Sequence, residues 1–309
     1  MAKIFIAGHK GMVGSAIIKK LSKKNQIYTI DKKKINLLNQ EQTLQYFKKN
    51  KFDQIYICAA KVGGIYANSK YAAEFIYQNL EIQNNCIYSA YKTNVKKLLF
   101  LGSSCIYPKD SKIPIKENYL LSGKLEETNE AYSIAKIAGL KMCESFNNQY
   151  NTDFRAVMPT NLYGPNDNYD DLNSHVLAAL IKKIQFAKIK KKKKILVWGN
   201  GLPKREFLHT DDFADACIKI MHISKKKYFN LVGKNNQFIN VGYGKDISIK
   251  DLTKLICSIT NYQGKIEYDK SKPNGTYRKL IDSSKIKKIN WKPNISLIEG
   301  ISSIIKNFK

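Results

Sequence analysis

The sequence contains very few arginines, and this shortage narrows the possible functions. Arginine accounts for only three of the 53 basic residues, although the formal net charge is +28. Nucleic-acid-binding surfaces tend to cluster their charge and to use arginine, whose planar guanidinium grips phosphates and bases. Here lysines are spread along the whole chain, so we expect a solvated basic surface and no nucleic-acid partner. The three arginines mark positions that need a planar fork: Arg155, Arg205 and Arg278.

Cysteine is also scarce, and uncharged apolar runs are short. Six cysteines in 309 residues are too few for a disulfide framework, and none stands at a spacing typical of a metal site. No uncharged apolar run approaches the ~18 residues that a membrane-spanning helix needs, and a strand pattern begins directly after Met1. The sequence therefore predicts a cytoplasmic protein with reduced thiols, no metal and no membrane partner.

Short apolar runs alternate with helical segments in the first half of the chain. The runs cover residues 4–7, 27–30, 53–60 and 97–101, and a long segment of helical character covers residues 71–92. Continuous apolar strands separated by helices form parallel sheets that are covered on both faces. The pattern predicts an α/β fold with a Rossmann-type, doubly wound parallel sheet.

The pattern changes after Pro165, where a polar loop leads to a helix near residues 176–187 and an apolar run at 195–198. We expect a smaller mixed α/β substrate lobe to begin there. The expected division assigns residues 1–162, rejoined by about 205–235, to a Rossmann domain. It assigns residues 163–204 and 236–309 to the smaller lobe.

Three glycines follow the first predicted strand and open a helix. Gly8, Gly11 and Gly14 stand at three-residue spacing, which lets backbone N–H groups approach a pyrophosphate at a helix N-terminus. Alone the glycines are a weak signal, but their position between strand and helix predicts a dinucleotide site.

Charged residues near this motif favour two different cofactors. Asp31 lies twenty residues beyond Gly11, where an acid would accept the ribose 2′-hydroxyl of NAD. Lys10 and Lys32–Lys34 surround it and would favour the 2′-phosphate of NADP. The residues alone leave both cofactors open.

Tyr132 and Lys136 form a candidate pair for proton transfer. They lie one helical turn apart on one face of a predicted helix, where the ammonium lowers the cost of forming a phenolate. The tyrosine could then protonate a carbonyl oxygen while a nicotinamide delivers hydride to the carbon. Ser103, just after the strand at 97–101, would lie at the carboxyl edge of the sheet and could hydrogen-bond the same oxygen.

Taken together, several segments resemble the GDP-L-fucose synthase family of the extended short-chain dehydrogenase/reductase superfamily. The resemblance runs nearly end to end. It implies conversion of GDP-4-keto-6-deoxy-D-mannose to GDP-L-fucose by C3 and C5 epimerisation and NADPH-dependent reduction at C4, and it suggests a homodimer. The segments are GHKGMVGSAI, AAKVGGI, FLGSSCIYPK, YSIAKIAG, VMPTNLYGPNDN, NSHV and REFLHTDD.

The resemblance also implies roles for individual residues. It makes Ser103, Tyr132 and Lys136 the superfamily triad, and Cys105 and His175 the acid/base pair for epimerisation. The implied cofactor contacts are Gly8, Lys10, Gly11, Met12, Val13, Gly14, Lys32, Leu101, Gly102, Ser103, Ser104, Lys136, Pro159, Thr160, Asn161, Leu162 and His175. The implied substrate contacts are Lys183, Trp198, Arg205, Asn274 and Lys279.

Two other functions are compatible with parts of the sequence. A nucleotide-sugar 4-epimerase or dehydratase with tightly held NAD is favoured by Asp31 and disfavoured by Cys105 with His175. A non-catalytic cofactor-binding or polyanion-binding protein is disfavoured by the intact set of Ser103, Tyr132 and Lys136, since binding alone needs no proton donor. The family's cofactor-phosphate arginines appear here as Lys10 and Lys32, and we expect NADPH as the cofactor.

Overall fold

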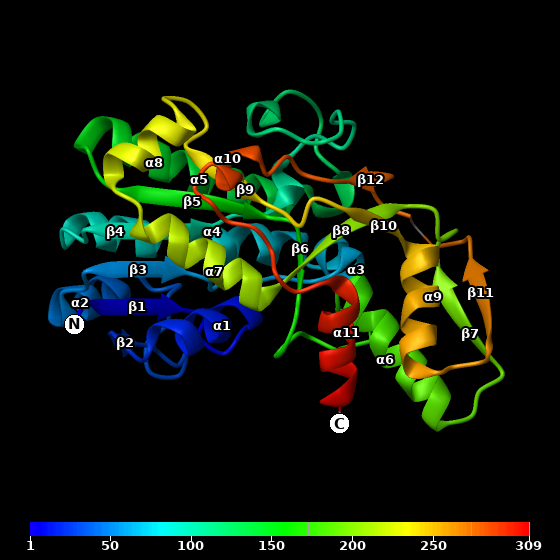
Figure 1. Ribbon diagram of the computed structural model, residues 1–309. Helices are drawn as coiled ribbons and strands as arrows, with labels where there is room; N and C mark the ends of the chain where they lie inside the picture. Colours follow the sequence, from blue (N-terminus) through cyan, green and yellow to red (C-terminus); the bar gives the residue numbers. More distant parts are fainter. Residues whose placement is uncertain (172, 273, 309) are drawn as a thin grey trace.

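A computed structural model describes residues 1–171, 173–272 and 274–308. Its largest element is a six-stranded sheet in which every neighbouring pair is parallel (Figure 1). The strand order is β2-β1-β3-β4-β5-β9. β2 lies on one side of β1 and all later strands lie on the other, as in doubly wound folds. The strands are β1 (Lys3–Ala7), β2 (Gln26–Tyr28), β3 (Gln54–Ile57), β4 (Lys97–Leu101), β5 (Phe154–Pro159) and β9 (Phe238–Val241).

Helices cover both faces of this sheet because its strands are apolar on both sides. Successive residues of β1 show this, since Phe5 packs into the core on one face and Ile6 into the core on the other. The first face is covered by α2 (Gln40–Asn50), α4 (Ala72–Lys92) and α5 (Glu130–Tyr150). The second face is covered by α1 (Met12–Leu21), α7 (Thr210–His222), α8 (Lys225–Val232) and α10 (Ser284–Lys287).

A smaller group of mixed strands and helices lies beside the carboxyl edge of the large sheet (Figure 1). β8 (Lys204–His209) pairs in parallel with β6 (Asn161–Tyr163) and β12 (Arg278–Lys279), and antiparallel with β10 (Asp246–Ser248). β7 (Lys194–Trp198) pairs in parallel with β11 (Lys265–Asp269). A third core joins them to α6 (Val176–Ile189), α9 (Ile249–Thr260) and α11 (Leu297–Lys306).

Short helical segments lie in the connections around the carboxyl edge: α3 (Ile65–Lys70), η1 (Ser104–Ile106), η2 (Glu117–Tyr119) and η3 (Glu127–Asn129). Within the described part of the chain, none of the helices combines the length and hydropathy that crossing a bilayer requires.

The predicted fold class is confirmed: the chain has a Rossmann-like parallel sheet with flanking helices and smaller mixed sheets. One segment lies elsewhere than expected. The sequence assigned residues 236–309 to the smaller lobe, yet β9 is an edge strand of the six-stranded sheet and α10 packs on that sheet's second face. The reason is packing, because Phe238 and Ile239 are fully buried in the cores on opposite faces. The division into two lobes stays a prediction.

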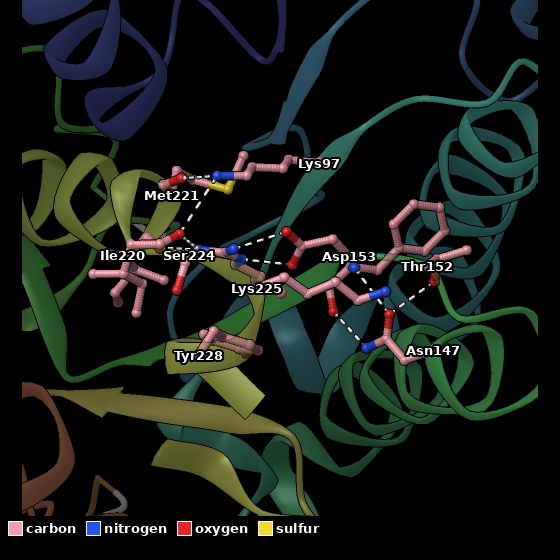
Figure 2. Close-up of polar contacts among 12 residues, drawn as sticks. Lys97, Asn147, Thr152, Asp153, Ile220, Met221, Ser224, Lys225 and Tyr228 are labelled. Atoms are coloured by element: carbon pink, nitrogen blue, oxygen red, sulfur yellow. Dashed lines mark hydrogen bonds and ion pairs between the residues drawn. The ribbon is translucent and has the colours of Figure 1, made fainter. Parts of the chain in front are cut away.

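Arg155 has a structural position far from the carboxyl edge. Its side chain is fully buried, and Nε and Nη2 donate to the two carboxylate oxygens of Asp153, each at 2.7 Å. Nη1 donates to the carbonyls of Ile220 and Ile223 at the end of α7, and the guanidinium lies 4.9 Å from the Tyr228 ring centre. Figure 2 shows Asp153, Ile220 and Tyr228 gathered at this point. The Arg155 guanidinium therefore joins β5 to carbonyls at the end of α7 that have no partner within the helix.

Candidate active site

The turn between β1 and α1 is shaped by glycine. Gly8 has a φ of +83°, and a Cβ there would lie 2.6 Å from the backbone nitrogen of Ala59. A Cβ on Gly14 would lie 2.2 Å from the carbonyl oxygen of Gly8. Gly11, the N-cap of α1, makes no side-chain capping bond. The first amides of α1 are thus available to an anion, and the cradle fits a dinucleotide pyrophosphate.

Asp31, which follows β2, is paired with Lys10 from the glycine turn. Lys10 Nζ lies 2.6 Å from Asp31 Oδ2, and the backbone N–H of Lys33 donates to Oδ1 at 3.1 Å. The hydrogen bond from Lys10 is the main cause that lowers the pKa of Asp31. The carboxylate is therefore ionised at neutral pH and already has a cationic partner.

Ser103 lies directly beyond the carboxyl end of β4. A Cβ on the preceding Gly102 would lie 2.3 Å from the sulfur of Met158, so glycine allows β4 and β5 to approach closely here. The Ser103 hydroxyl accepts a hydrogen bond from the backbone N–H of Cys105 at 3.2 Å, which fixes the start of η1. The serine is thereby held at the sheet edge where ligands bind in such folds.

Tyr132 and Lys136 lie on α5 and face the end of β4. Lys136 is buried, and its Nζ donates to the carbonyl of Leu101 at 2.9 Å and lies 5.8 Å from the centre of the Tyr132 ring. Burial lowers the pKa of Lys136 to about 8. Burial also raises the pKa of Tyr132, and a hydrogen bond with Ser103 acts against that shift. The structure thus brings Ser103, Tyr132 and Lys136 together.

The thiol of Cys105 has two nitrogen donors near it. Lys279 Nζ from β12 and Asn129 Nδ2, just before α5, each lie 3.7 Å from the sulfur. The Ser133 hydroxyl donates to the Cys105 carbonyl at 2.9 Å and so holds the cysteine against α5. Cys105 therefore lies where the large sheet and the smaller group of strands meet.

His175 is the residue preceding α6. His175 is exposed, and desolvation by the neighbouring protein lowers the pKa of its imidazole. In the part of the chain that the structure describes, no hydrogen bond joins His175 to Cys105 or Tyr132. The loop before His175 is tied to the loop after β3, since Gly64 N–H donates to the Asn173 carbonyl at 3.0 Å.

Arg205 on β8 is next to Lys279 in the sheet register. Its guanidinium donates to the carbonyls of Lys204 at 2.9 Å and Asn274 at 3.4 Å. Desolvation lowers the pKa of Arg205, and the nearby Cys105 and Glu126 act against that shift. A guanidinium still accessible in a desolvated position suits an anionic ligand.

The other predicted substrate contacts lie around the edges of the smaller group of strands. Trp198, at the end of β7, is 45% exposed, and Lys272 lies 5.7 Å from its ring centre. Lys183 on α6 donates to the Leu196 carbonyl at 2.6 Å, and burial lowers its pKa. Asn274 accepts from the backbone N–H of Asn200 at 2.9 Å.

The sequence did not define the contacts of two residues near the site, Asn129 and Arg278. Asn129 was not predicted, although it stands three residues before Tyr132, on the segment that enters α5. For Arg278 the sequence indicated only a position that needs a planar guanidinium. The structure pairs Arg278 with Asp246, with Nε to Oδ2 at 2.5 Å and Nη2 to Oδ1 at 3.3 Å, so it supports the strand that carries Lys279.

Comparisons with known proteins agree with this geometry. The model of the NAD dependent epimerase/dehydratase family matches residues 4–235. The chain is 46% identical to the GDP-L-fucose synthase of Escherichia coli (strain K12) over 99% of its own length and 96% of that protein's. It is 47% identical to GDP-L-fucose synthase 1 of Arabidopsis thaliana, over 97% and 91% of the two lengths. The crystal structure of a GDP-L-fucose synthetase from Naegleria fowleri bound to NADP superposes with a TM-score of 0.87 at 25% identity, over 99% and 94% of the two chains.

Proposed function

Because this chain belongs to the NAD dependent epimerase/dehydratase family, and within it to the GDP-L-fucose synthases, we propose that it converts GDP-4-keto-6-deoxy-D-mannose to GDP-L-fucose. The observation that carries the proposal is the meeting of Ser103, Tyr132 and Lys136 with Cys105 at the carboxyl end of β4. The first three serve a reduction at a carbonyl, and the thiol serves proton transfer at a neighbouring carbon. One site therefore holds groups for both halves of the reaction.

The residues present fit NADPH, which when bound supplies the hydride that reduces C4. The glycine cradle of Gly8, Gly11 and Gly14 would hold its pyrophosphate, and Lys10 and Lys32 would face its 2′-phosphate. The end of β4 and the segment Pro159–Leu162 are the other proposed contacts. The NADP-bound relative supports the same cofactor.

In the reduction step, Tyr132 donates its phenolic proton to the C4 oxygen. Ser103, which hydrogen-bonds Tyr132, would hydrogen-bond the same substrate oxygen and hold it at the proton donor. The ammonium of Lys136, buried beneath the tyrosine, stabilises the phenolate that remains. A tyrosine with a raised pKa stays protonated at neutral pH and so remains ready to act as an acid.

Epimerisation precedes reduction, since it depends on the C4 ketone. C3 and C5 both flank this ketone, so each proton can leave to form an enolate, whose oxygen Ser103 and Tyr132 stabilise. Inversion requires a base on one side of the ring and an acid on the other. We assign these roles to Cys105 and His175, because a thiol and an imidazole can each take up and give back a proton.

We assign the nucleotide diphosphate to the smaller group of strands. Arg205 would act as a fork for the diphosphate, and Lys183 and Lys279 would add positive charge. Trp198 offers an exposed ring face, and Asn274 lies beside Arg205. On this assignment the residues of the large sheet hold NADPH and those of the smaller lobe hold the nucleotide sugar.

Incubation with GDP-4-keto-6-deoxy-D-mannose and NADPH tests the proposed function. We expect stoichiometric loss of nicotinamide absorbance and formation of GDP-L-fucose. An NAD-dependent 4-epimerase or dehydratase would instead convert its sugar without net consumption of reductant. Asp31 favours that alternative only when free, and here it is paired with Lys10. Failure to oxidise NADPH in the presence of the keto sugar would contradict the proposal.

We also propose that the protein is a homodimer that works in a reducing compartment, the cytoplasm. Helices α4 and α5 pack side by side and expose Tyr77 and Ile134, which are 58% and 43% exposed. Two such faces could join through a four-helix contact. Light scattering should give twice the chain mass, and Ile134→Glu should yield a monomer. All six cysteines are free thiols, in keeping with reducing conditions.

A further inference from the structure

A hydrogen bond joins the segment that enters α5 to the loop that enters β12. Thr276 Oγ1 donates to Glu126 Oε2 at 3.2 Å, and Thr128 Oγ1 donates to the other oxygen of the same carboxylate at 3.4 Å. Glu126 stands just before η3, on the path to the catalytic helix. Thr276 stands just before Arg278, where β12 begins. The bond therefore links the part of the chain that carries Tyr132 to the part that carries Lys279.

The loop that carries Thr276 lies directly on Arg205. Gly275 has a φ of +66°, and a Cβ there would lie 3.3 Å from Arg205 Nη2 and 3.3 Å from Ile65 Cδ1 of α3. The preceding residue, Asn274, accepts from the same Arg205 nitrogen through its carbonyl. Displacement of the loop would therefore change the surroundings of the guanidinium.

Glu126 places negative charge close to a site that must accept a diphosphate. A free carboxylate beside Arg205 would repel that ligand and compete for the guanidinium. Here both carboxylate oxygens already accept threonine hydroxyls. Arg205 forms no ion pair with Glu126 among the described residues. Its Nη1 and Nη2 each donate one hydrogen bond to a backbone carbonyl, and each carries a second N–H that a ligand could accept.

We propose that Glu126 and Thr276 are a positioning pair that holds the loop of residues 274–276 against Arg205 and so shapes the diphosphate site. The inference rests on the proposed function for the identity of the ligand. Neither residue is among those assigned to proton or hydride transfer, so the pair acts on binding and leaves the chemical step to Tyr132 and Lys136.

Loss of the bond should weaken binding of the nucleotide without slowing turnover. A hydrogen bond of this kind changes an equilibrium constant by about 3- to 10-fold when it is removed. Thr276→Val should therefore weaken GDP binding and raise the KM of the keto sugar by that factor, with kcat within about twofold, since uniform binding is lost. Thr276→Ser keeps the hydroxyl and should bind GDP like the unmodified protein.

Calorimetric titration with GDP tests the pair independently of turnover. Glu127→Gln is the matched control for the loss of Glu126. The side chain of this neighbouring glutamate is 87% exposed, and its loss changes the net charge by the same amount. In a Glu126→Ala background, Thr276→Val should change the Kd of GDP by less than about twofold, because its partner is already gone.

Three results would overturn the positioning pair. They are an unchanged Kd for Thr276→Val, an equally weakened Kd for Thr276→Ser, and an undiminished effect of Thr276→Val in the Glu126→Ala background. Absence of keto-sugar turnover in the unmodified protein would contradict the proposed function instead, and the GDP titration would still decide the pair.

Discussion

The ammonium nitrogen of Lys10 lies 2.6 Å from Oδ2 of Asp31 and occupies a carboxylate that would otherwise be free to accept the ribose 2′-hydroxyl of NAD. The pair resolves the opposing signals that the sequence places around the glycine turn. With Asp31 engaged, we propose that Lys32 and the neighbouring lysines offer positive charge to the cofactor's 2′-phosphate without an unpaired acid beside them.

The first prediction is a preference for NADPH that depends on Lys10. Lys10→Met should raise the KM for NADPH by about tenfold, the size of one lost charge contact to a phosphate. The same change frees Asp31, so the KM for NADH should stay constant or fall. Steady-state kinetics with both cofactors measures this.

Lys48→Met serves as the control, because Lys48 is an exposed lysine of α2 and its loss changes the net charge equally. A clear preference of the unmodified enzyme for NADH would mean that Asp31 accepts the ribose hydroxyl.

The second prediction concerns the pH dependence of reduction. Burial holds the pKa of Lys136 at about 8, so the ammonium is lost as the pH rises through that value. Tyr132, whose pKa is raised, is still protonated there. The kcat/KM for the keto sugar should therefore fall above about pH 8.

Lys136→Arg keeps the charge at every accessible pH, and any activity it retains should extend to higher pH. A profile that stays level to about pH 9.5 in the unmodified enzyme would exclude Lys136 as the titrating group.

The third prediction concerns stability and the buried fork of Arg155. Arg155→Met leaves Asp153 as an unpaired buried carboxylate, which should lower the free energy of unfolding by about 3–5 kcal/mol. Lys96→Met removes an exposed pair, Lys96–Asp53, and should cost less than about 1 kcal/mol. Urea denaturation compares the two. Equal losses of unfolding free energy in the two variants would show that the buried Arg155–Asp153 pair contributes no more to stability than the exposed pair.

The sequence was informative wherever a feature depends on neighbours in the chain. Strands such as β3 and β4 are continuous apolar runs, and the four-residue spacing of Tyr132 and Lys136 places both on one helical face. These local patterns correctly predicted the parallel sheet and its flanking helices.

Contacts between distant segments could not be read in the same way. Cys105 and Lys279 are 174 residues apart, and only the family resemblance suggested that they share a site. The place of β9 beside β5 and the bond from Thr276 to Glu126 depend on pairing across the fold. Neither has a periodic signal in the sequence.

The fourth prediction tests the proton donor. Tyr132→Phe removes only the phenolic hydroxyl, so reduction should slow by about 10²–10⁴-fold while NADPH binding stays nearly constant. Tyr150→Phe, on the exposed end of the same helix, should leave the rate unchanged. Single-turnover oxidation of NADPH gives the rate, and fluorescence titration gives the affinity. Wild-type turnover by Tyr132→Phe would show that another group supplies the proton.

The fifth prediction separates epimerisation from reduction. Cys105→Ser should slow proton exchange at the carbons beside the ketone, because a serine hydroxyl is far less acidic than a thiol and its alkoxide is rarely formed. On the proposed mechanism hydride transfer depends on Tyr132, so it should remain possible. The variant should then reduce some sugar without full inversion. His175→Asn should also impair exchange, because it removes the imidazole.

Mass spectrometry of the sugar after incubation in deuterated water tests the account most directly. The unmodified enzyme should incorporate deuterium at both C3 and C5, and Cys105→Ser and His175→Asn should incorporate it more slowly while their thermal unfolding stays unchanged. Exchange at both carbons as fast as wild type in both variants would contradict the assignment of Cys105 and His175, and with it the epimerase half of the mechanism.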